Sequence, residues 1–209
     1  MSHKIVVVDY GAGNLHSVAR ALAHEGGDFV ISASPAEVSR ADRIVLPGVG
    51  AFGDSIRELE RRELVEPLKA FLATGRPFLG ICVGMQLLMS ESTEFGEHPG
   101  LGFIPGKVVR LSAERVKVPH VGWNAIAPAR PGAWEGTCLD GLEVERPMVY
   151  FVHSYNAEPA EEHRLADAAH GDNRICAAVR RENAVGLQFH PEMSGAVGLR
   201  VLRRFLTEG

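Results

Sequence analysis

The stretch FLGICVGMQLL, residues 78–88, is an apolar run in which Gly80 and Gly84 flank a single cysteine, Cys82. Glycine weakens both strands and helices, so two glycines at this spacing need a physical reason. The arrangement has the form glycine–x–nucleophile–x–glycine, which is typical of a sharp turn from a strand into a helix. Such a turn pushes the central side chain out of the core. We therefore expect a strand over residues 77–81 to end at this turn.

A turn of this kind would place Cys82 in the environment of a reactive thiol. The start of the next helix, which we expect to continue through Met89, would favour the thiolate through its dipole and its free N–H groups. The N–H of Val83 would point toward an oxyanion formed by attack at Cys82. The alternative is an ordinary buried cysteine in an apolar stretch, which is a common fate for this residue. The pattern alone does not decide between the two.

Strand and helix patterns alternate through the first half of the chain. Residues 4–9 and 43–48 predict buried strands, residues 14–27 predict a helix, and residues 54–75 predict one helix or two. The second half is richer in β-structure. Its expected elements are strands over 106–111, 148–155, 174–181 and 184–190 and a closing helix over 196–209. We expect one α/β domain over residues 1–209, with a mainly parallel central sheet flanked by helices and a β-rich second half.

Composition narrows the classes of function. The 209 residues include 22 Lys and Arg against 26 Asp and Glu, a formal net charge of −4, which argues against a nucleic-acid partner. No apolar stretch is long enough to span a bilayer, and the start of the chain makes a poor signal peptide, so we expect a cytoplasmic protein. Three cysteines fit neither a disulfide framework nor a metal knuckle.

A candidate base for the thiol lies in GLQFHPEMS, residues 186–194. His190 follows an apolar strand and would lie at the carboxyl edge of the sheet, where sites of α/β proteins form. Glu192 is two residues later, and in an extended segment both side chains would project to one side. Taken alone, a surface histidine beside a solvated glutamate is the favoured interpretation. Together with the turn at Cys82, a base with its orienting carboxylate becomes the favoured one.

Seven motifs extend this pattern along nearly the whole chain. In order they are DYGAGNL, LPGVGAFGD, LGICVGMQLL, GLGFIPGKVVRL, VPHVGWN, YFVHSY and QFHPEMS. The chain thereby resembles the class I, or triad-type, glutamine amidotransferases, and within them the glutaminase subunits of imidazole glycerol phosphate synthase. A single glycine–x–cysteine–x–glycine motif is only moderately specific, whereas seven motifs in this order are highly specific.

The resemblance implies a role for each residue of a triad. Cys82 would attack the side-chain amide of glutamine and give a glutamyl thioester and ammonia. His190 would take the thiol proton, pass it to the departing amine and then activate water. Glu192 would orient His190 and stabilise its cationic form.

The resemblance also implies an oxyanion hole and a glutamine pocket. Val49 and Gly50, opposite Val83, would form the hole. The residues that would hold glutamine are Gln86, Glu94, Ser154 and Tyr155. Because Gly48 can take either sign of φ, we expect the N–H of Val49 to point away at rest and to turn inward when a partner carries its own substrate.

The implied partner is a cyclase subunit with a (β/α)8 barrel, which uses the ammonia to make imidazole glycerol phosphate and an aminoimidazole carboxamide ribonucleotide in histidine biosynthesis. Such a barrel needs about 250 residues, so the partner would be a separate chain in a heterodimer. The residues expected at the interface are Asn14, His120, Trp123, Asn124 and Tyr150, with the HVGWN motif in a loop. The family commonly has lysine where this chain has Met193, which puts one interface contact in doubt.

The sequence argues against some other functions and leaves two alternatives open. A dinucleotide fingerprint at GAGN fails because His16 stands where glycine is required. No HxH or HExxH pattern occurs, so we expect neither a metal nor a cofactor. The alternatives for function are an amidotransferase subunit of another synthase, such as anthranilate synthase, and a stand-alone cysteine hydrolase. A binding module without activity is disfavoured because all three triad residues are present.

Overall fold

The expected alternation of strands and helices is present in the computed structural model, which describes residues 4–11, 13–142 and 146–207. The elements of the first half are β1 (Ile5–Val8), α1 (Leu15–His24), β2 (Phe29–Ser32), α2 (Pro35–Arg40), β3 (Arg43–Gly48), α3 (Phe52–Arg61), α4 (Val65–Leu72), β4 (Phe78–Cys82) and α5 (Val83–Gln86). Then follow β5 (Met89–Ser92), β6 (His98–Pro99), β7 (Ile104–Arg110), β8 (His120–Ala125), β9 (Ala127–Pro128), β10 (Met148–His153) and β11 (Tyr155–Pro159). The chain continues with the 3-10 turn η2 (Glu161–His163), β12 (Arg164–His170), β13 (Asn173–Arg181), β14 (Ala184–Leu187), the 3-10 turn η3 (Pro191–Met193) and α6 (Gly195–Thr207).

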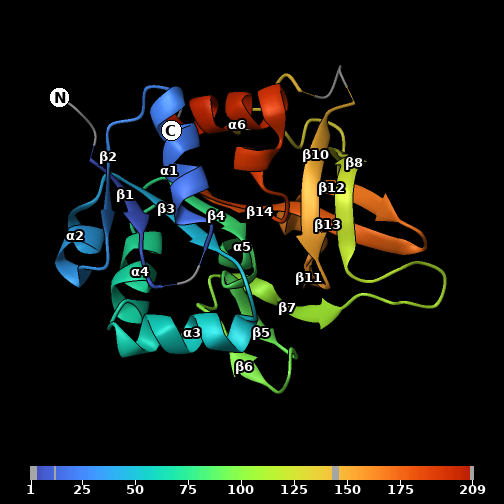
Figure 1. Ribbon diagram of the computed structural model, residues 1–209, viewed down its shortest axis with the longest axis horizontal. Helices are drawn as coiled ribbons and strands as arrows, with labels where there is room; N and C mark the ends of the chain where they lie inside the picture. Colours follow the sequence, from blue (N-terminus) through green and yellow to red (C-terminus); the bar gives the residue numbers. More distant parts are fainter. Residues whose placement is uncertain (1–3, 12, 143–145, 208–209) are drawn as a thin grey trace.

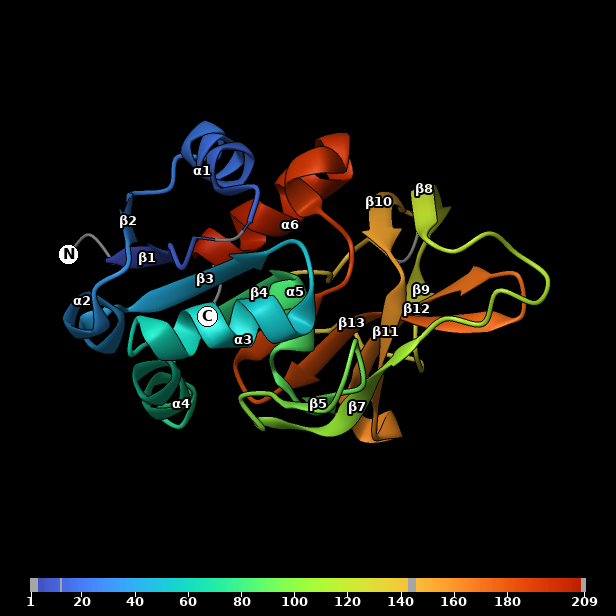
Figure 2. The same ribbon diagram turned by 60° about the horizontal axis from the view of Figure 1, so that its bottom comes forward.

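The main sheet has eight strands in the order β2-β1-β3-β4-β14-β13-β12-β9. The strands from β2 to β14 in this order run parallel, and β13, β12 and β9 extend the sheet antiparallel. Figure 2 shows α1 and α6 on one face of the parallel part and α3 and α4 on the other. The prediction of a mainly parallel sheet flanked by helices is therefore confirmed.

Cover on both faces explains the composition of the central strands. Every residue of β1, β3 and β4 is buried. Strands buried on both faces are near-continuous apolar runs because neither face meets water. The predicted region 54–75 contains two helices, α3 and α4, rather than one.

The β-rich part of the chain forms two smaller sheets beside the main one (Figure 1). One is the four-stranded sheet β11-β7-β5-β6 and the other is the pair β10-β8. The single strand expected over 148–155 is divided at Ser154 into β10 and β11, which belong to different sheets. This division places Ser154 at a bend between two sheets.

Two local predictions are wrong. The helix after Cys82 ends at Gln86, and Met89 already begins a strand. The HVGWN motif is not a loop, because His120–Ala125 pair with β10 as strand β8. Among the described residues, no helix combines the length and the apolar character needed to cross a membrane.

Candidate active site

The two glycines around Cys82 are required by close backbone packing. A Cβ at Gly84 would lie 1.9 Å from the carbonyl oxygen of Leu46, and a Cβ at Gly80 would lie 2.6 Å from that of Gly84. Both distances are far below any allowed contact, so only glycine fits. Cys82 has φ +55°, a left-handed conformation that is costly for a residue with a side chain. The expected sharp turn between strand and helix is present, and its strain lies at the cysteine.

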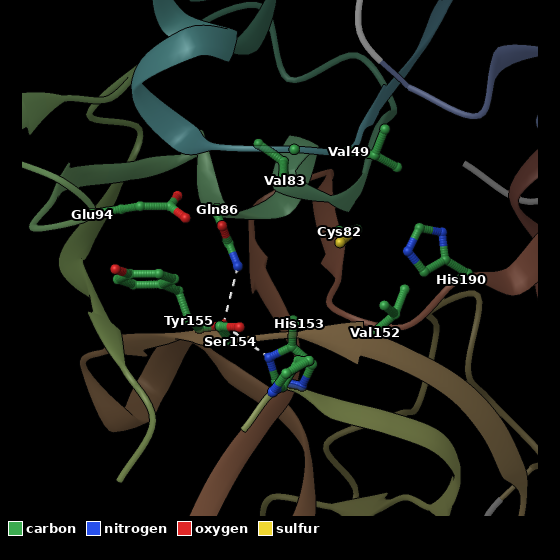
Figure 3. A pocket seen from close by; sticks show the side chains of 12 residues that line it. Val49, Cys82, Val83, Gln86, Glu94, Val152, His153, Ser154, Tyr155 and His190 are labelled. Carbon is green, nitrogen blue, oxygen red and sulfur yellow. Dashed lines mark hydrogen bonds between the residues drawn. The ribbon is translucent and has the colours of Figure 1, made fainter. Parts of the chain in front are cut away.

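The turn directs Cys82 into a cavity of about 320 Å³ (Figure 3). The residue is only 4 % exposed, so it is buried, but its sulfur faces the cavity rather than the core. Such a volume is in the range for small-molecule sites, about 300–1,000 Å³. The cavity is lined by Val49, Gly50, Cys82, Val83, Gln86, Glu94, Pro119, Val152, His153, Ser154, Tyr155 and His190.

His190 lies three residues after the end of β14, the strand that pairs with β4, and lines the same cavity. Figure 3 shows its imidazole facing the sulfur of Cys82. Its Nδ1 lies 2.8 Å from Oε1 of Glu192, and both side chains are almost fully buried. The reason for this pairing differs from the expected one, because Glu192 lies in the 3-10 turn η3 and not in an extended segment. The turn folds the carboxylate back onto the imidazole.

The protonation of His190 follows from these neighbours. Burial by itself lowers the pKa of the imidazole, but a Cys82 thiolate and the Glu192 carboxylate outweigh burial and raise that pKa to about 10. Because Nδ1–H donates to Glu192, Nε2 is the nitrogen that remains for exchange with the sulfur. This Nε2 is buried and has no hydrogen-bond partner among the residues that the structure describes. The arrangement can carry a thiolate–imidazolium pair.

Backbone contacts with β10 hold His190 in place. The N–H of His190 donates to the carbonyl of Tyr150 at 2.9 Å. The hydroxyl of Ser194 donates to the carbonyl of His190 at 2.6 Å and accepts from the N–H of Tyr150 at 2.9 Å. Ser194 therefore closes a ring of hydrogen bonds that fixes the turn carrying the base.

The opposite end of the cavity has a different chemical character. Oε2 of Glu94 accepts a 2.7 Å hydrogen bond from the N–H of Phe52. Burial raises the pKa of the Glu94 carboxyl, and the Phe52 N–H and His98 partly offset this rise. Figure 3 shows Glu94, Gln86 and Tyr155 grouped at this end, away from Cys82. A partly buried carboxylate is stabilised by a cation, so this end suits a ligand ammonium group.

The residues expected to form an oxyanion hole also line the cavity. Val49 and Gly50 follow β3, and Gly50 has φ +95°. Val83 begins α5, where the first N–H groups of a helix have no intrahelical acceptor. Since α5 has only four residues, its dipole contributes less to a Cys82 thiolate than the sequence suggests. The turning of the Val49 N–H stays a prediction.

Four residues of the site were not predicted from the sequence. Pro119, Val152 and His153 line the cavity, and Gln188 contacts Cys82. His153 and Gln188 lie inside motifs that carry the family resemblance, but alternating strand patterns do not tell which polar side chain turns toward a ligand. Their contribution depends on how the small sheets pack against the main one.

The residues expected at a partner interface divide between two faces of the β10-β8 pair. Trp123 and Tyr150 lie opposite each other on the outer face, with ring centroids 6.2 Å apart. His120 and Asn124 point to the inner face, where His120 is 3 % exposed and Asn124 donates to the carbonyl of Ala169. Their side chains bond to groups within this chain, and their interface role stays a prediction. Asn14 precedes α1, and its interface role stays a prediction.

In the described part of the chain, no group of three or more His, Cys, Asp or Glu side chains could hold a metal ion. The histidines His120, His153 and His170 are close together, but hydrogen bonds account for both ring nitrogens of His120 and His153 and for Nε2 of His170. His120 Nδ1 lies 3.0 Å from His153 Nε2, and His170 Nε2 donates to the carbonyl of Lys117.

Comparison with known proteins agrees with this geometry. The family described as glutamine amidotransferase class-I matches residues 6–208. The chain is 45% identical to the imidazole glycerol phosphate synthase subunit HisH 1 of Legionella pneumophila (strain Lens), over 97% of this chain and 98% of that protein. It is 47% identical to the HisH subunit of Geobacter metallireducens, over 96% of each chain.

Solved structures share the fold at lower identity. A glutamine amidotransferase crystal structure superposes with a TM-score of 0.73 at 19% identity, over 96% of both chains. The structure of PurLQS from Thermotoga maritima gives the same TM-score and identity, over 99% of this chain and 98% of that chain. These likenesses confirm the fold class.

Proposed function

Because this chain belongs to the class I glutamine amidotransferase family, we propose that it is the glutaminase subunit of imidazole glycerol phosphate synthase in histidine biosynthesis. It hydrolyses glutamine and supplies ammonia to a cyclase subunit. The observation that carries the proposal is a single cavity that joins Cys82, the His190–Glu192 pair and the candidate oxyanion donors. The near full-length identity to HisH proteins favours this synthase over one of the anthranilate type.

The two ends of the cavity define how glutamine would lie. Its ammonium group would meet Glu94, whose Oε2 is already held by the N–H of Phe52. Its carboxamide would then reach the sulfur of Cys82 at the other end (Figure 3). Ser154, at the bend between two sheets, and Tyr155 would contact the substrate backbone.

The chemistry follows from the triad. Nε2 of His190 takes the thiol proton of Cys82, and the sulfur attacks the carboxamide carbon. The N–H groups of Val83 and of Val49 or Gly50 would stabilise the oxyanion. His190 returns the proton to the leaving nitrogen as ammonia departs, and it then activates water to release glutamate from the thioester. Glu192 stabilises the imidazolium at each stage.

An uncovered apolar surface next to the cavity supports a protein partner. On the outer face of β8 and β10, Val121 and Trp123 are 54% and 53% exposed, and Met148 and Val152 are 44% and 41% exposed. The cavity-lining Val152 belongs to both the surface and the site. An exposed apolar patch of this kind is typical of an interaction site. A (β/α)8 cyclase docked here would receive ammonia without exposure to water, where protonation would remove its nucleophilicity.

The decisive experiment measures glutamine hydrolysis by the wild type and by Cys82→Ala, with and without the cyclase subunit and its nucleotide ligand. We expect near-silent activity alone, strong stimulation in the complex and none for the variant. Partner-independent cleavage of peptides or esters would instead indicate a stand-alone hydrolase. Stimulation only by the partner of another synthase would refute the assignment to histidine biosynthesis.

A further inference from the structure

A series of hydrogen-bonded, buried side-chain amides ends on the sulfur of Cys82. Nε2 of Gln188 lies 3.6 Å from Sγ, within hydrogen-bonding distance for sulfur. Gln188 follows β14, is fully buried and lies two residues before His190. Its Oε1 accepts a 3.0 Å hydrogen bond from Nε2 of Gln86. Neither the triad nor the oxyanion hole gives Gln188 a role.

The direction of each hydrogen bond in this series of amides can be deduced. Gln86 also lies 3.1 Å from the carbonyl oxygen of Tyr155, which can only accept (Figure 3). The amide NH₂ of Gln86 must therefore face Tyr155, and its second hydrogen points to Gln188. Gln188 in turn presents its oxygen to Gln86, so its NH₂ group faces the sulfur. The side chain is a donor to Cys82 and not an acceptor.

The carbonyl of Tyr155 also accepts a hydrogen bond from a second series of hydrogen-bonded side chains. Nδ1 of His153 donates to it at 2.8 Å (Figure 3), which leaves Nε2 to accept from Nδ1 of His120 at 3.0 Å. Nε2 of His120 then accepts from Asn124 at 3.2 Å, and the other amide hydrogen of Asn124 goes to Ala169. Burial lowers the pKa of His120 and of His153 to about 4, consistent with the neutral rings that this order requires. The acceptor that orients Gln86 is thus itself fixed.

We propose that Gln188 is a further catalytic residue, which donates a hydrogen bond to the thiolate of Cys82. The S–H bond breaks as the proton passes to Nε2 of His190, and the electron pair stays on sulfur. A hydrogen bond to a charged acceptor is stronger than one to a neutral acceptor, and a fixed, buried donor needs no reorganisation when the charge forms. The same contact stabilises the thiolate again when it leaves the thioester. The inference rests on the proposed function, in which Cys82 is the nucleophile.

The first test measures the rate of Cys82 alkylation by iodoacetamide against pH, with mass spectrometry separating Cys82 from the other two cysteines. Gln188→Met keeps the length of the side chain but removes the donor. We expect alkylation about tenfold slower at pH 7, equivalent to about 1.4 kcal/mol, and a profile displaced to higher pH. Gln188→Glu keeps the shape but turns an oxygen toward the sulfur, so alkylation should be slower still.

The matched control is Thr137→Val, which removes two other buried hydrogen bonds, one that Thr137 donates to the carbonyl of Trp134 and one that it accepts from the N–H of Leu139. Thr137 lies beside Pro77, at the end of β4 remote from Cys82. The pH profile of Cys82 alkylation in the Thr137→Val variant should equal that of the wild type. A folded Gln188→Met protein with the wild-type profile would overturn the proposal, and if that variant does not fold, the same result for Gln188→Glu would do so.

A second measurement does not depend on the folding of any Gln188 variant. The side-chain ¹⁵N resonance of Gln188 in the wild type should move as Cys82 ionises, whereas in Cys82→Ala it should stay constant through the same pH range. A resonance that is unchanged in the wild type contradicts the hydrogen bond.

In the cyclase complex, Gln188→Met should lower kcat/KM for glutamine at least tenfold. Absence of hydrolysis by the wild-type complex would instead refute the proposed function and leave the alkylation result intact.

Discussion

The two walls of the cavity are built by different kinds of contact. The elbow wall, residues 80–86, is set by backbone packing, in which Gly80 and Gly84 approach their neighbours too closely for any side chain. The network wall consists of residues 153–155 together with His190, and side-chain hydrogen bonds hold it, from His153 to Tyr155 and from Ser194 to His190. One wall places the nucleophile and the other places the base.

The difference predicts how each wall responds to change. Close-packed backbone cannot accommodate an added atom, so substitutions that add atoms at Gly80 or Gly84 in the elbow wall should act on stability. A hydrogen-bonded wall can lose one partner and keep its shape, so substitutions there should act on activity or on pH dependence.

Replacement of the base should give the largest change. In His190→Asn, no group remains to take the thiol proton, and we expect kcat for glutamine in the cyclase complex to fall roughly ten-thousandfold. Circular dichroism should show a folded protein, because His190 belongs to the network wall. A loss of less than tenfold would mean that His190 is not the base.

Gly84→Ala should unfold the elbow wall. The new Cβ would lie 1.9 Å from the carbonyl oxygen of Leu46, so the free energy of unfolding should fall by at least about 3 kcal/mol in chemical denaturation. The control is Gly26→Ala, where φ is +79° but no atom lies within 4 Å, and we expect a loss of only about 1 kcal/mol. A loss at Gly84 no larger than the loss at Gly26 would show that close packing does not select glycine at Gly84.

Trp123→Ala tests whether the outer face of β8 and β10, next to the network wall, is a docking surface. The side chain is 53% exposed, so the stability of the isolated chain should hardly change. Binding of the cyclase should weaken by about 2 kcal/mol, roughly thirtyfold in Kd by calorimetry. Val30→Ala, on the edge strand β2, is the control and should bind normally. Unchanged binding of the Trp123 variant would move the interface elsewhere.

Acid should weaken the network wall gradually. The pKa values of His120 and His153 are lowered to about 4, so between pH 4 and 6.5 the unfolded chain binds more protons than the folded one. The free energy of unfolding should therefore fall as pH falls through this window, by up to about 1.4 kcal/mol per group per pH unit. His190, whose pKa is raised to about 10, stabilises the folded state in a separate pH window. Its contribution to the free energy of unfolding is complete below about pH 6.5 and is lost as the pH rises toward 10.

The variant His153→Asn should flatten the acid dependence, because one of the two neutral rings is gone. His24→Gln, at the exposed end of α1, is the control and should keep the wild-type slope. Denaturation curves at pH 5 and pH 7 are sufficient for the comparison. An unchanged slope in the His153 variant would contradict the neutral, hydrogen-bonded state of the network.

Local features of the fold were predictable because they depend on neighbouring residues. The apolar runs of β1, β3 and β4 and the paired glycines around Cys82 express backbone requirements at short range. Features that depend on distant packing were not predictable. The end of α5 at Gln86 and the strand at His120–Ala125 are decided by pairing with β7 and β10, partners far away in the sequence.

Glycine spacing and apolar periodicity act locally. The parallel sheet, the sharp turn at Cys82 and the histidine and glutamate at strand-end spacing could therefore be predicted from the residues alone. Tertiary packing brought these groups into one cavity, placed Glu192 against His190 through a 3-10 turn, and turned His120 and Asn124 toward the inner face of their strand pair. It also decided that Gln188 donates to the sulfur. The physical reason is that hydrogen-bond direction is set by acceptors such as the Tyr155 carbonyl, which come from distant segments and meet only in the folded chain.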